Sequence, residues 1–407
     1  MPIGLFHPAF RGIGGAEILV ATWAQYMKRV GVDVRVVTMD LDERRWRSWF
    51  EGISLTVTAS GSWLDLLSSD RRKLERAVPR IEASLSDCGA VLASNFPANA
   101  LLGASSIKAK RVWFCNEPSR KFHLVATSPR LHEQVRSSPG GSSDVERDYV
   151  RALAKYERAQ RRRAFRDVVQ FDLQNTVKLD GLLALTEFGR DSVRRVYARS
   201  DATVVYPMVR FPARRARPRA GLDRSGLKIL THSRLSILKN VDTVIRAFAK
   251  VVAKLPGSVL HVVGEGGHKK RLEKLALDLG LANSTHFHGH LPEAELNRVY
   301  DDCDVFALLP LDEPFGMVFP EAAARGLLLV GPDHGGPLEI LDGGRQGFCC
   351  DPFSPEAVAE AFQQIWRLSD AEVDARRVAA DDACRARFSE AVIGPQILRA
   401  LGSAARA

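Results

Sequence analysis

The chain has 407 residues, which is long enough for two domains that each bury a core of their own. Hydrophobic residues make up 45% and charged residues 26%, which are ordinary values for a soluble globular protein, and no apolar run reaches the length of a membrane span. The formal net charge of +10 favours anionic partners.

The first residues and the cysteines predict a cytoplasmic protein. Apolar residues begin at Ile3, directly after Met1-Pro2, with no basic segment or signal core ahead of them, so we expect no export by the usual route. None of the six cysteines forms a C-x-x-C pair, and the adjacent Cys349 and Cys350 suit neither a zinc site nor an easy disulfide. We therefore expect small core residues in a reducing compartment.

The first half of the chain alternates strands and helices. A strand over Ile3–Phe6 precedes a glycine loop over Gly12–Gly15, a helix over Ala16–Arg29 and a strand over Val32–Thr38. Further strands are expected at 90–93, 111–114 and 182–185. This βαβ order predicts a parallel sheet with helices on both faces.

Three later stretches follow other patterns. Ser119–Asp144 is rich in Ser, Pro, Arg and His and has no clear period, so we expect a mobile loop or one that faces a substrate. Val145–Val169 predicts a long and very basic helix. Val204–Pro207 and the proline- and arginine-rich tract to Arg224 predict an interdomain linker.

The strand–helix order then restarts. Strands are expected at 227–231, 258–263, 285–288, 305–309 and 327–330, and helices at 241–254, 269–279 and 389–400. Two successive α/β units of similar size predict domains over residues 1–206 and 207–385 with a cleft between them. The final helix, within 386–407, is expected to cross back to the first domain.

Basic residues are concentrated in one part of the chain. Residues 146–220 hold about twice as many basic as acidic side chains, including Arg161-Arg162-Arg163 and the arginines of 214–219. Such a field attracts nucleic acid, anionic lipid or phosphorylated substrates, and a merely solvated arginine-rich surface is an equally good interpretation. Nucleic acid is the weakest of these, because no recognised binding motif with interleaved aromatic residues is present.

The glycine loop of the first domain has two interpretations. Gly12-x-Gly14-Gly15-Ala16-Glu17 precedes a helix, and Asp40 ends the next strand, as in a dinucleotide-binding motif with a ribose-binding acid. The loop is long and its spacing does not match G-x-G-x-x-G, which disfavours NAD binding.

The stretch from Asp312 to Glu321 links a buried strand to a helix that starts near Pro320. Strand, loop and helix in this order present a ligand site at the carboxyl edge of a sheet. Two carboxylates, Glu313 and Glu321, flank Gly316 and the helix amides, which suits a ligand with hydroxyls and phosphates such as a nucleotide-sugar. The alternative is a surface loop whose glutamates cap the helix.

Other strand ends in the second half carry candidate ligand groups. Arg234 and Lys239 follow the strand at 227–231 and would lie at the same sheet edge as Glu313, where two cations can bind a diphosphate leaving group. The loop Gly264-Glu265-Gly266 and the pair His290-Leu291 follow two further strands, where backbone groups can meet a nucleobase. Taken separately, each of these signals is weak.

Asp302-Cys303-Asp304 has the form of a D-x-D metal motif. Because it joins the end of a helix to a buried strand, a turn or cap explains it better, and we predict no metal.

Taken in order, these motifs resemble glycosyltransferase family 4, a retaining family with the GT-B fold. The resemblance spans nearly the whole chain and is carried by Gly14-Gly15-Ala16-Glu17, Arg234 with Lys239-Asn240, Gly264-Glu265-Gly266, Glu313-Pro314-Phe315-Gly316 with Glu321, Gly335-Gly336-Pro337-Leu338-Glu339-Ile340, Thr186-Glu187-Phe188 and Tyr206-Pro207. It implies two Rossmann-like doubly wound α/β domains that face a central cleft.

The resemblance also implies roles for the matched residues. Arg234 and Lys239 would hold the donor diphosphate, Glu313 would contact the sugar, and Glu321 would accept hydrogen bonds from the ribose. The donor would further be bound by backbone or side-chain groups of Gly14, Gly15, Gly264, Glu265, His290, Leu291, Phe315, Gly316, Met317 and Val318. No metal or other cofactor is implied, and attack on the same face of the sugar would need no enzyme nucleophile.

One segment departs from the family pattern. Phe114-Cys115-Asn116-Glu117-Pro118-Ser119-Arg120 resembles the C-H-x-P-x-R segment of many mannose-transferring relatives, with Asn116 in place of the histidine. Asparagine can hydrogen-bond a sugar hydroxyl but cannot exchange a proton near neutral pH. Glu117 or His123 then compensates, or Asn116 only positions substrate, or activity is reduced, so the general base stays open. We expect Glu117, Arg120 and His123 on the acceptor side.

The sequence therefore predicts a cytoplasmic retaining hexosyltransferase, with peripheral contact to the inner membrane face as a weaker expectation. GDP-mannose is the first expectation for the donor and a UDP-sugar the second, and the acceptor would be a glycan, a lipid-linked intermediate or a small molecule. The alternatives are a non-catalytic relative that binds nucleotide-sugars or glycans, an NAD-dependent dehydrogenase and a nucleic-acid-binding protein.

Overall fold

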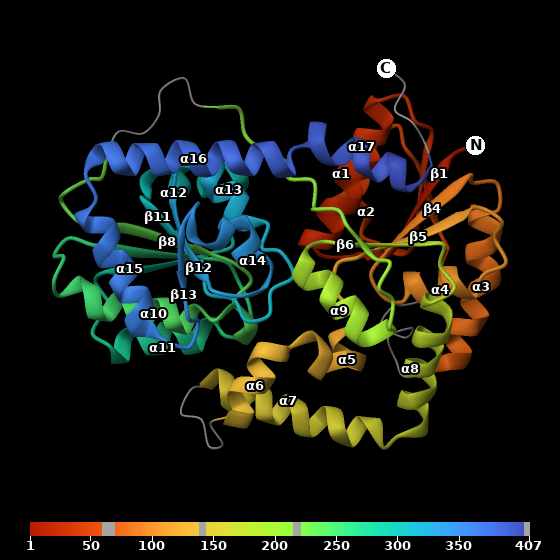
Figure 1. Cartoon of the computed structure of the whole chain (residues 1–407), viewed down its shortest axis with the longest axis horizontal. Coiled ribbons are helices and arrows are strands. Elements are labelled where there is room, and N and C mark those ends of the chain that lie inside the picture. Colours follow the sequence, from red (N-terminus) through yellow and green to blue (C-terminus); the bar gives the residue numbers. More distant parts are fainter. Residues whose placement is uncertain (59–69, 138–143, 215–220, 403–407) are drawn as a thin grey trace. The chain divides into compact units, whose positions relative to one another are not determined.

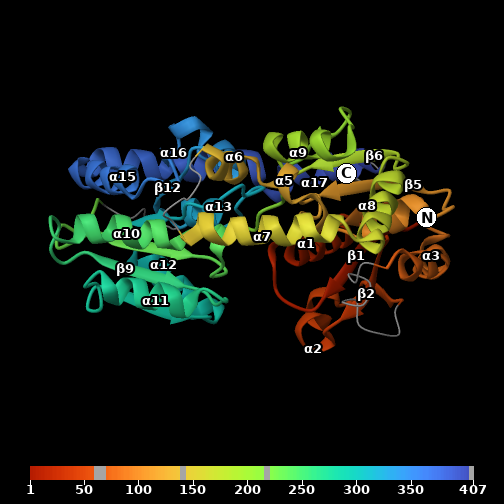
Figure 2. The same ribbon diagram turned by 90° about the horizontal axis from the view of Figure 1, so that it is seen from below.

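The computed structural model describes residues 1–58, 70–137, 144–214 and 221–402. The chain forms two compact units. Unit 1 comprises Met1–His132, Tyr149–Met208 and the chain from Glu390 onward, and unit 2 comprises Glu133–Asp148 and Val209–Ser389. Each unit is built on a parallel sheet with helices on both faces (Figures 1 and 2).

The sheet of unit 1 has seven strands in the order β3-β2-β1-β4-β5-β6-β7. The strands are β1 (Ile3–Phe10), β2 (Val34–Leu41), β3 (Ser54–Val57), β4 (Ala90–Ser94), β5 (Lys110–Cys115), β6 (Gly181–Ala184) and β7 (Thr203–Val204). All eight residues of β1 are buried, as expected for a central parallel strand that is covered on both faces. The expected strands of the first half are therefore present, most of them longer than predicted.

The helices of unit 1 connect these strands. They are α1 (Gly15–Arg29), α2 (Glu43–Trp46), α3 (Arg71–Leu85), α4 (Ala98–Ala104), α5 (Arg120–Thr127), α8 (Arg163–Thr176), α9 (Glu187–Tyr197) and α17 (Glu390–Ala400). Helices α6 (Pro129–Ser137) and α7 (Asp144–Gln160) contain the stretch that belongs to unit 2. The last helix, α17, packs on α1, and a side chain at Gly394 would meet the ring of Tyr26.

The expected loop over Ser119–Asp144 is wrong for most of its length, because α5 and α6 occupy it. The backbone of His123 leaves the helical region inside α5, so the apolar positions never repeat long enough to show a helical period. Phe122 of α5 is nevertheless buried, with its ring against Phe96 and Phe165. The expected single helix over Val145–Val169 is also wrong, since it is divided into α7 and α8.

The sheet of unit 2 has six strands in the order β10-β9-β8-β11-β12-β13. The strands are β8 (Lys228–His232), β9 (Val259–Val263), β10 (Thr285–Gly289), β11 (Val305–Ala307), β12 (Leu328–Pro332) and β13 (Phe348–Cys350). The helices are α10 (Val241–Val252), α11 (Lys269–Asp278), α12 (Glu293–Asp302), α13 (Val318–Ala324), α14 (Gly335–Ile340), α15 (Pro355–Arg367) and α16 (Asp370–Phe388).

No helix in the described part of the chain is long and apolar enough to cross a membrane. The cysteines are free, and all but the half-buried Cys349 are buried. Of the arginines expected in the linker, Arg215, Arg217 and Arg219 lie outside the described residues.

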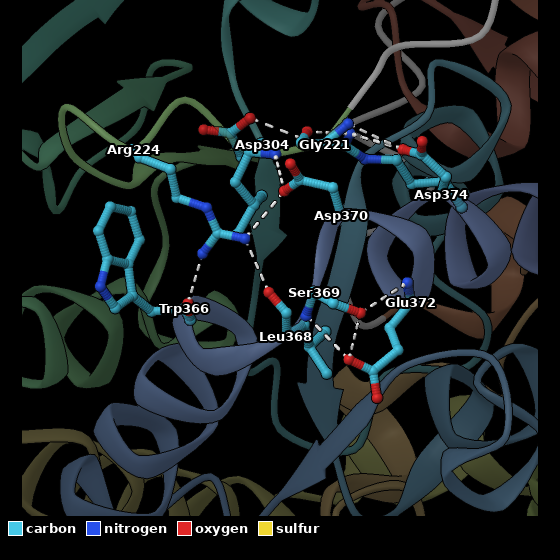
Figure 3. Close-up of polar contacts among 11 residues, drawn as sticks. Gly221, Arg224, Asp304, Trp366, Leu368, Ser369, Asp370, Glu372 and Asp374 are labelled. Carbon is cyan, nitrogen blue, oxygen red and sulfur yellow. Dashed lines mark hydrogen bonds and ion pairs between the residues drawn. The ribbon is translucent and has the colours of Figure 1, made fainter.

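The segment that enters unit 2 is fastened to the start of α16 (Figure 3). Arg224 donates to the carbonyls of Trp366 and Leu368, both at 2.7 Å, and to Asp370 at 2.9 Å. These carbonyls end α15, where a cation stabilises the unpaired acceptors of a helix terminus. Arg224 therefore ties the linker, α15 and α16 together.

A buried ion pair joins α16 to the sheet. Arg377 donates to the carbonyl of Gly221 at 2.6 Å and lies 3.3 Å from Asp304, and both charged side chains are almost fully buried. Asp302 pairs with Lys228 at 3.0 Å. The D-x-D sequence thus serves two structural ion pairs, and the described residues contain no group of three or more ligands that could hold a metal ion.

We expect Arg377→Ala to lower the free energy of unfolding by about 3–5 kcal/mol, because it leaves the Asp304 carboxylate buried without its cation. The neighbouring exposed Arg376→Ala is the control and should cost less than about 1 kcal/mol. Urea denaturation of the two variants measures the difference. Equal losses would show that the buried ion pair does not stabilise unit 2.

Candidate functional site

The candidate site lies at the carboxyl edge of the unit 2 sheet. In a parallel sheet all strands end at one edge, and the loops that leave it approach one another there. The loops after β8, β9, β11 and β12 carry most of the residues that the sequence singles out.

The loops after β8 and β11 are joined by an ion pair. Lys239 Nζ lies 2.6 Å from Glu313 Oε2, and both side chains are only partly exposed, at 27% and 19%. β8 and β11 are neighbours in the sheet, which brings the two loops together although 74 residues separate them. The structure therefore places two of the predicted site residues in direct contact, open enough for a ligand to reach them.

Asn240 fixes the backbone beside Lys239. It adopts a left-handed conformation with φ of 52°, which asparagine tolerates better than most residues. Its buried amide donates to the carbonyls of Leu309 and Pro352 at 3.0 and 2.8 Å. The sequence motif contains Asn240 but implies no role for it. In the structure, Asn240 anchors the loop and thereby orients Lys239.

The glycines of this edge allow loops to pack on loops. A side chain at Gly264 would meet the carbonyl oxygen of Ser233 at 1.8 Å, and one at Gly266 would meet that of Leu235 at 2.1 Å. A side chain at Gly336 would meet the carbonyl oxygen of Pro314 at 2.2 Å. Because these glycines have no side chain, the loops after β9 and β12 can pack directly against the backbone of the loops after β8 and β11.

Glu321 on α13 lies in an unusual environment. Burial raises the pKa of its carboxyl to about 7, and the cation of Arg325 offsets part of this effect. Nearby, the Arg325 guanidinium stacks over the ring of Tyr300 at 4.7 Å, and the Tyr300 hydroxyl lies 3.0 Å from Nδ1 of His232. Burial lowers the pKa of His232 to about 4, so this imidazole is neutral at pH 7.

The remaining predicted residues of unit 2 differ in what they contact. Arg234 is exposed, and its guanidinium makes no hydrogen bond or ion pair with the described residues. Glu265 pairs with Lys269 at 2.7 Å. His290 is exposed, while the ring of Phe315 is buried against Phe388. Leu291, Met317 and Val318 are half-buried, and Gly316 has a φ of 92°, which favours glycine.

Unit 1 carries the predicted glycine loop at the start of α1. Gly14 is the residue before α1, and a side chain there would meet Glu17 Oε2 at 2.5 Å, so Glu17 folds back over the loop. The Nε2 atom of the buried His7 lies 3.8 Å from Glu17 Oε1. Asp40 accepts a hydrogen bond from Arg11 at 2.7 Å. This contact occupies the carboxylate that would bind the ribose in an NAD-binding motif.

Asn116 lies at the end of β5. Its amide nitrogen donates to Ser94 Oγ at 2.9 Å and to Asn95 Oδ1 at 2.8 Å. An amide nitrogen has only two hydrogens, so these contacts leave the carbonyl oxygen of Asn116 as the acceptor. The next residue, Glu117, pairs with Arg120 at 2.5 Å.

His123 differs from its expected placement on the acceptor side. It is buried, and its Nε2 lies 2.9 Å from Asp172, a fully buried carboxylate. Asp172 also accepts from Tyr197 at 2.9 Å and from Asn99 at 2.8 Å. His123 thus belongs to a hydrogen-bond network that holds α5 in unit 1, which argues against direct contact with an acceptor.

The raised pKa of Glu321 predicts a dependence of stability on pH. Between about pH 4.5 and about 7 the folded chain binds more protons at this residue than the unfolded chain, so its contribution to stability falls as the pH rises. We expect Glu321→Gln to match the wild type in melting temperature at pH 5 and to exceed it at pH 8. A difference independent of pH would contradict the assigned environment.

The sequence comparisons match only part of the chain. Residues 213–381 match the family model for glycosyl transferases group 1. The chain is 33% identical to a glycogen synthase of Mycobacterium tuberculosis over 171 residues, which are 42% of this chain and 40% of the relative. It is 34% identical to a GDP-mannose-dependent phosphatidylinositol monomannoside mannosyltransferase of Mycolicibacterium smegmatis over 174 residues, which are 41% and 44% of the two chains. The chain thus spans less than half the length of these relatives.

Solved structures resemble the whole chain. HepE from Anabaena, solved in complex with UDP and glucose, has a TM-score of 0.70 at 19% identity, covering 99% of this chain and 100% of the other. Sucrose-phosphate synthase from Thermosynechococcus elongatus has a TM-score of 0.70 at 18% identity, covering 98% and 97%. These similarities confirm the predicted fold class, with two Rossmann-like α/β domains of the GT-B type.

Proposed function

We propose that the chain is a retaining glycosyltransferase of family 4 that transfers a sugar from a nucleoside diphosphate to an acceptor. The observation that carries the proposal is the Lys239–Glu313 ion pair at the carboxyl edge of the unit 2 sheet. It lies within residues 213–381, the part that matches the glycosyl transferase family model. Glu321 stands on the helix that follows the same loop as Glu313.

Each residue of the edge has a chemical task in this proposal. Arg234 and Lys239 bind the diphosphate and stabilise the negative charge that develops on it as the sugar bond breaks. Glu313 accepts hydrogen bonds from the sugar hydroxyls and keeps Lys239 in place before the donor arrives. Glu321 accepts hydrogen bonds from the ribose hydroxyls, which favours its ionised form.

The reaction exchanges one bond for another at the anomeric carbon. The bond from this carbon to the diphosphate oxygen breaks, and a bond to the acceptor oxygen forms on the same face of the sugar. The proton of the acceptor hydroxyl passes to the departing phosphate, so the enzyme supplies neither a nucleophile nor a base. Asn116 fits this scheme, because its carbonyl oxygen accepts a hydrogen bond from a hydroxyl without removing the proton.

GDP-mannose is the first proposal for the donor and a UDP-sugar is the second. The first is supported by the likeness of the segment around Asn116 to mannosyltransferases and by a relative named as GDP-mannose-dependent. The second is supported by the likeness of the fold to a protein solved with UDP. Melting curves of the chain with GDP, UDP and their sugars distinguish them, since the bound ligand raises the melting temperature.

A non-catalytic protein that binds nucleotide-sugars is the second candidate function. Asn116 favours it, because the mannose-transferring enzymes that the surrounding segment resembles have a histidine at this position. Donor hydrolysis or sugar transfer by the purified chain supports the enzyme. Binding of a nucleotide-sugar without turnover, over a broad set of acceptors, supports the second candidate.

We expect Arg234→Ala to weaken nucleoside diphosphate binding by about 1.5–3 kcal/mol, or about 10- to 100-fold, because it removes a charge-assisted contact. Calorimetric titration measures this change. Arg298→Ala, which removes another exposed arginine of unit 2, is the control and should leave the affinity unchanged. Equal affinities of the two variants would contradict the role of Arg234.

We expect Glu313→Ala to lower the transfer rate about 100-fold while it lowers the free energy of unfolding by about 1 kcal/mol or less. The small stability effect follows from the partial exposure of both partners of the ion pair. Activity assays and urea denaturation of the same preparation compare the two losses. Loss of folding in parallel with activity would favour the interpretation of Glu313 as a structural residue.

A further inference from the structure

Hydrogen bonds join the loop after β12 to the loop that carries Glu313. The amide of Gly336 donates to the carbonyl of Glu313 at 2.8 Å. The amide of Asp312, the residue before Glu313, donates to Nε2 of His334 at 3.3 Å. The first contact involves backbone atoms alone, whereas the second depends on a side chain whose charge can change.

The backbone of Asp312 is held in a conformation that costs free energy. Its φ of 49° lies in the left-handed region, and the residue is fully buried. A buried amide that loses its acceptor is costly, so the contact with His334 stabilises this turn of the chain. Since Glu313 follows directly and pairs with Lys239, a displacement of Asp312 moves one partner of that ion pair.

The contacts of His334 define which of its ring nitrogens carries the proton. Nε2 accepts from the amide of Asp312, so this nitrogen has no hydrogen. Nδ1 lies 3.3 Å from Oδ1 of Asp333 and therefore donates. The imidazolium has a hydrogen on both nitrogens and cannot accept at Nε2. The side chain of His334 is 16% exposed, which gives water access to the ring.

Other titratable groups lie on the segments around His334. Asp333 accepts from Nδ1 in either charge state of the ring, so a second proton disrupts the contact at Nε2. Burial, together with the charge of Asp333, raises the pKa of the Cys349 thiol to about 11 and that of the Cys350 thiol to about 12, so both stay neutral near pH 7. The remaining charged or titratable groups on these segments are Asp312, Glu313 with its partner Lys239, and Asp351.

We propose that His334 is a positioning residue of the donor site, and that a second proton on its ring releases the loop that carries Glu313. This inference rests on the proposed function and adds a control by pH to it. With the ring neutral, Asp312 is held and Glu313 stays beside Lys239. With the ring charged, two N–H groups face each other and the loop leaves the loop after β12. Binding of the sugar part of the donor then weakens, because Glu313 contacts the sugar in the proposed reaction.

Hydrogen exchange in the ligand-free chain tests the contact between His334 and Asp312. Mass spectrometry of a peptide that spans Asp312 compares the wild type, His334→Gln and His334→Ala at about pH 5 and about pH 8, on either side of the range in which histidine changes charge. Glutamine keeps an acceptor and does not titrate. We expect wild type and His334→Gln to exchange equally at the higher pH. At the lower pH the wild type should exchange several-fold faster than His334→Gln, and His334→Ala should be fast at both.

Calorimetric titration with GDP-mannose and with UDP-glucose measures the effect on the donor. At about pH 8 we expect His334→Ala to weaken donor affinity by about 3- to 10-fold, as for the loss of one hydrogen bond, and His334→Gln to match the wild type. At about pH 5, His334→Gln should bind more tightly than the wild type. Glu321 also changes charge in this range, but it does so in every variant, so its effect cancels between them. GDP and UDP without the sugar should show smaller differences.

His286→Gln is the matched control, because it removes an exposed imidazole from β10 of unit 2 and should resemble the wild type in both measurements. Melting curves check that each variant is folded at both pH values. Equal exchange in the wild type and both His334 variants would overturn the positioning role. A wild type that matches His334→Gln in exchange and affinity at about pH 5 would overturn the control by pH. If the wild type binds neither donor, the proposed function fails instead, and the exchange comparison still decides the role of His334.

Discussion

The ion pair between Lys239 and Glu313 is the interaction on which the proposed function depends. It joins loops that leave two adjacent strands of the unit 2 sheet, and its partners remain partly exposed. A cation that already has a carboxylate partner is held in one position before a ligand arrives. The energetic cost of ordering that side chain is then met in folding rather than in binding.

The surrounding structure serves to keep this pair in place. Asn240 fixes the backbone after Lys239 through two carbonyls, and Gly336 allows the start of α14 to lie against the loop that carries Glu313. These contacts form at the edge of the parallel sheet where its strands end. The chemical groups of the site therefore come from residues that are far apart in the sequence and rigid in the fold.

The sequence predicted the strands well and the connecting helices less well. Buried parallel strands such as β1 and β8 contain short apolar runs, which make them recognisable in the sequence. Helix α5 was missed because the break at His123 interrupts its period. The prediction of one helix over Val145–Val169 was wrong, because a turn at Arg161 and Arg162 separates α7 from α8, which have similar compositions.

The candidate site was also predictable only in part. The contact between Lys239 and Glu313 follows from two motifs at neighbouring strand ends. The burial of His123 does not, because its partner Asp172 lies 49 residues away in the sequence. The surroundings of Glu321 could not be predicted either, since Tyr300 belongs to none of the motifs that point to the site. Such environments depend on packing between residues that are far apart in the sequence, so no local sequence pattern predicts them.

A crystal structure of the chain with a bound nucleoside diphosphate tests the central claim most directly. The account predicts that the phosphate oxygens lie about 2.7–3.2 Å from Arg234 and Lys239, with the ribose hydroxyls against Glu321. A nucleotide bound away from the loops that follow β8 and β11, with the Lys239–Glu313 pair untouched, would contradict it.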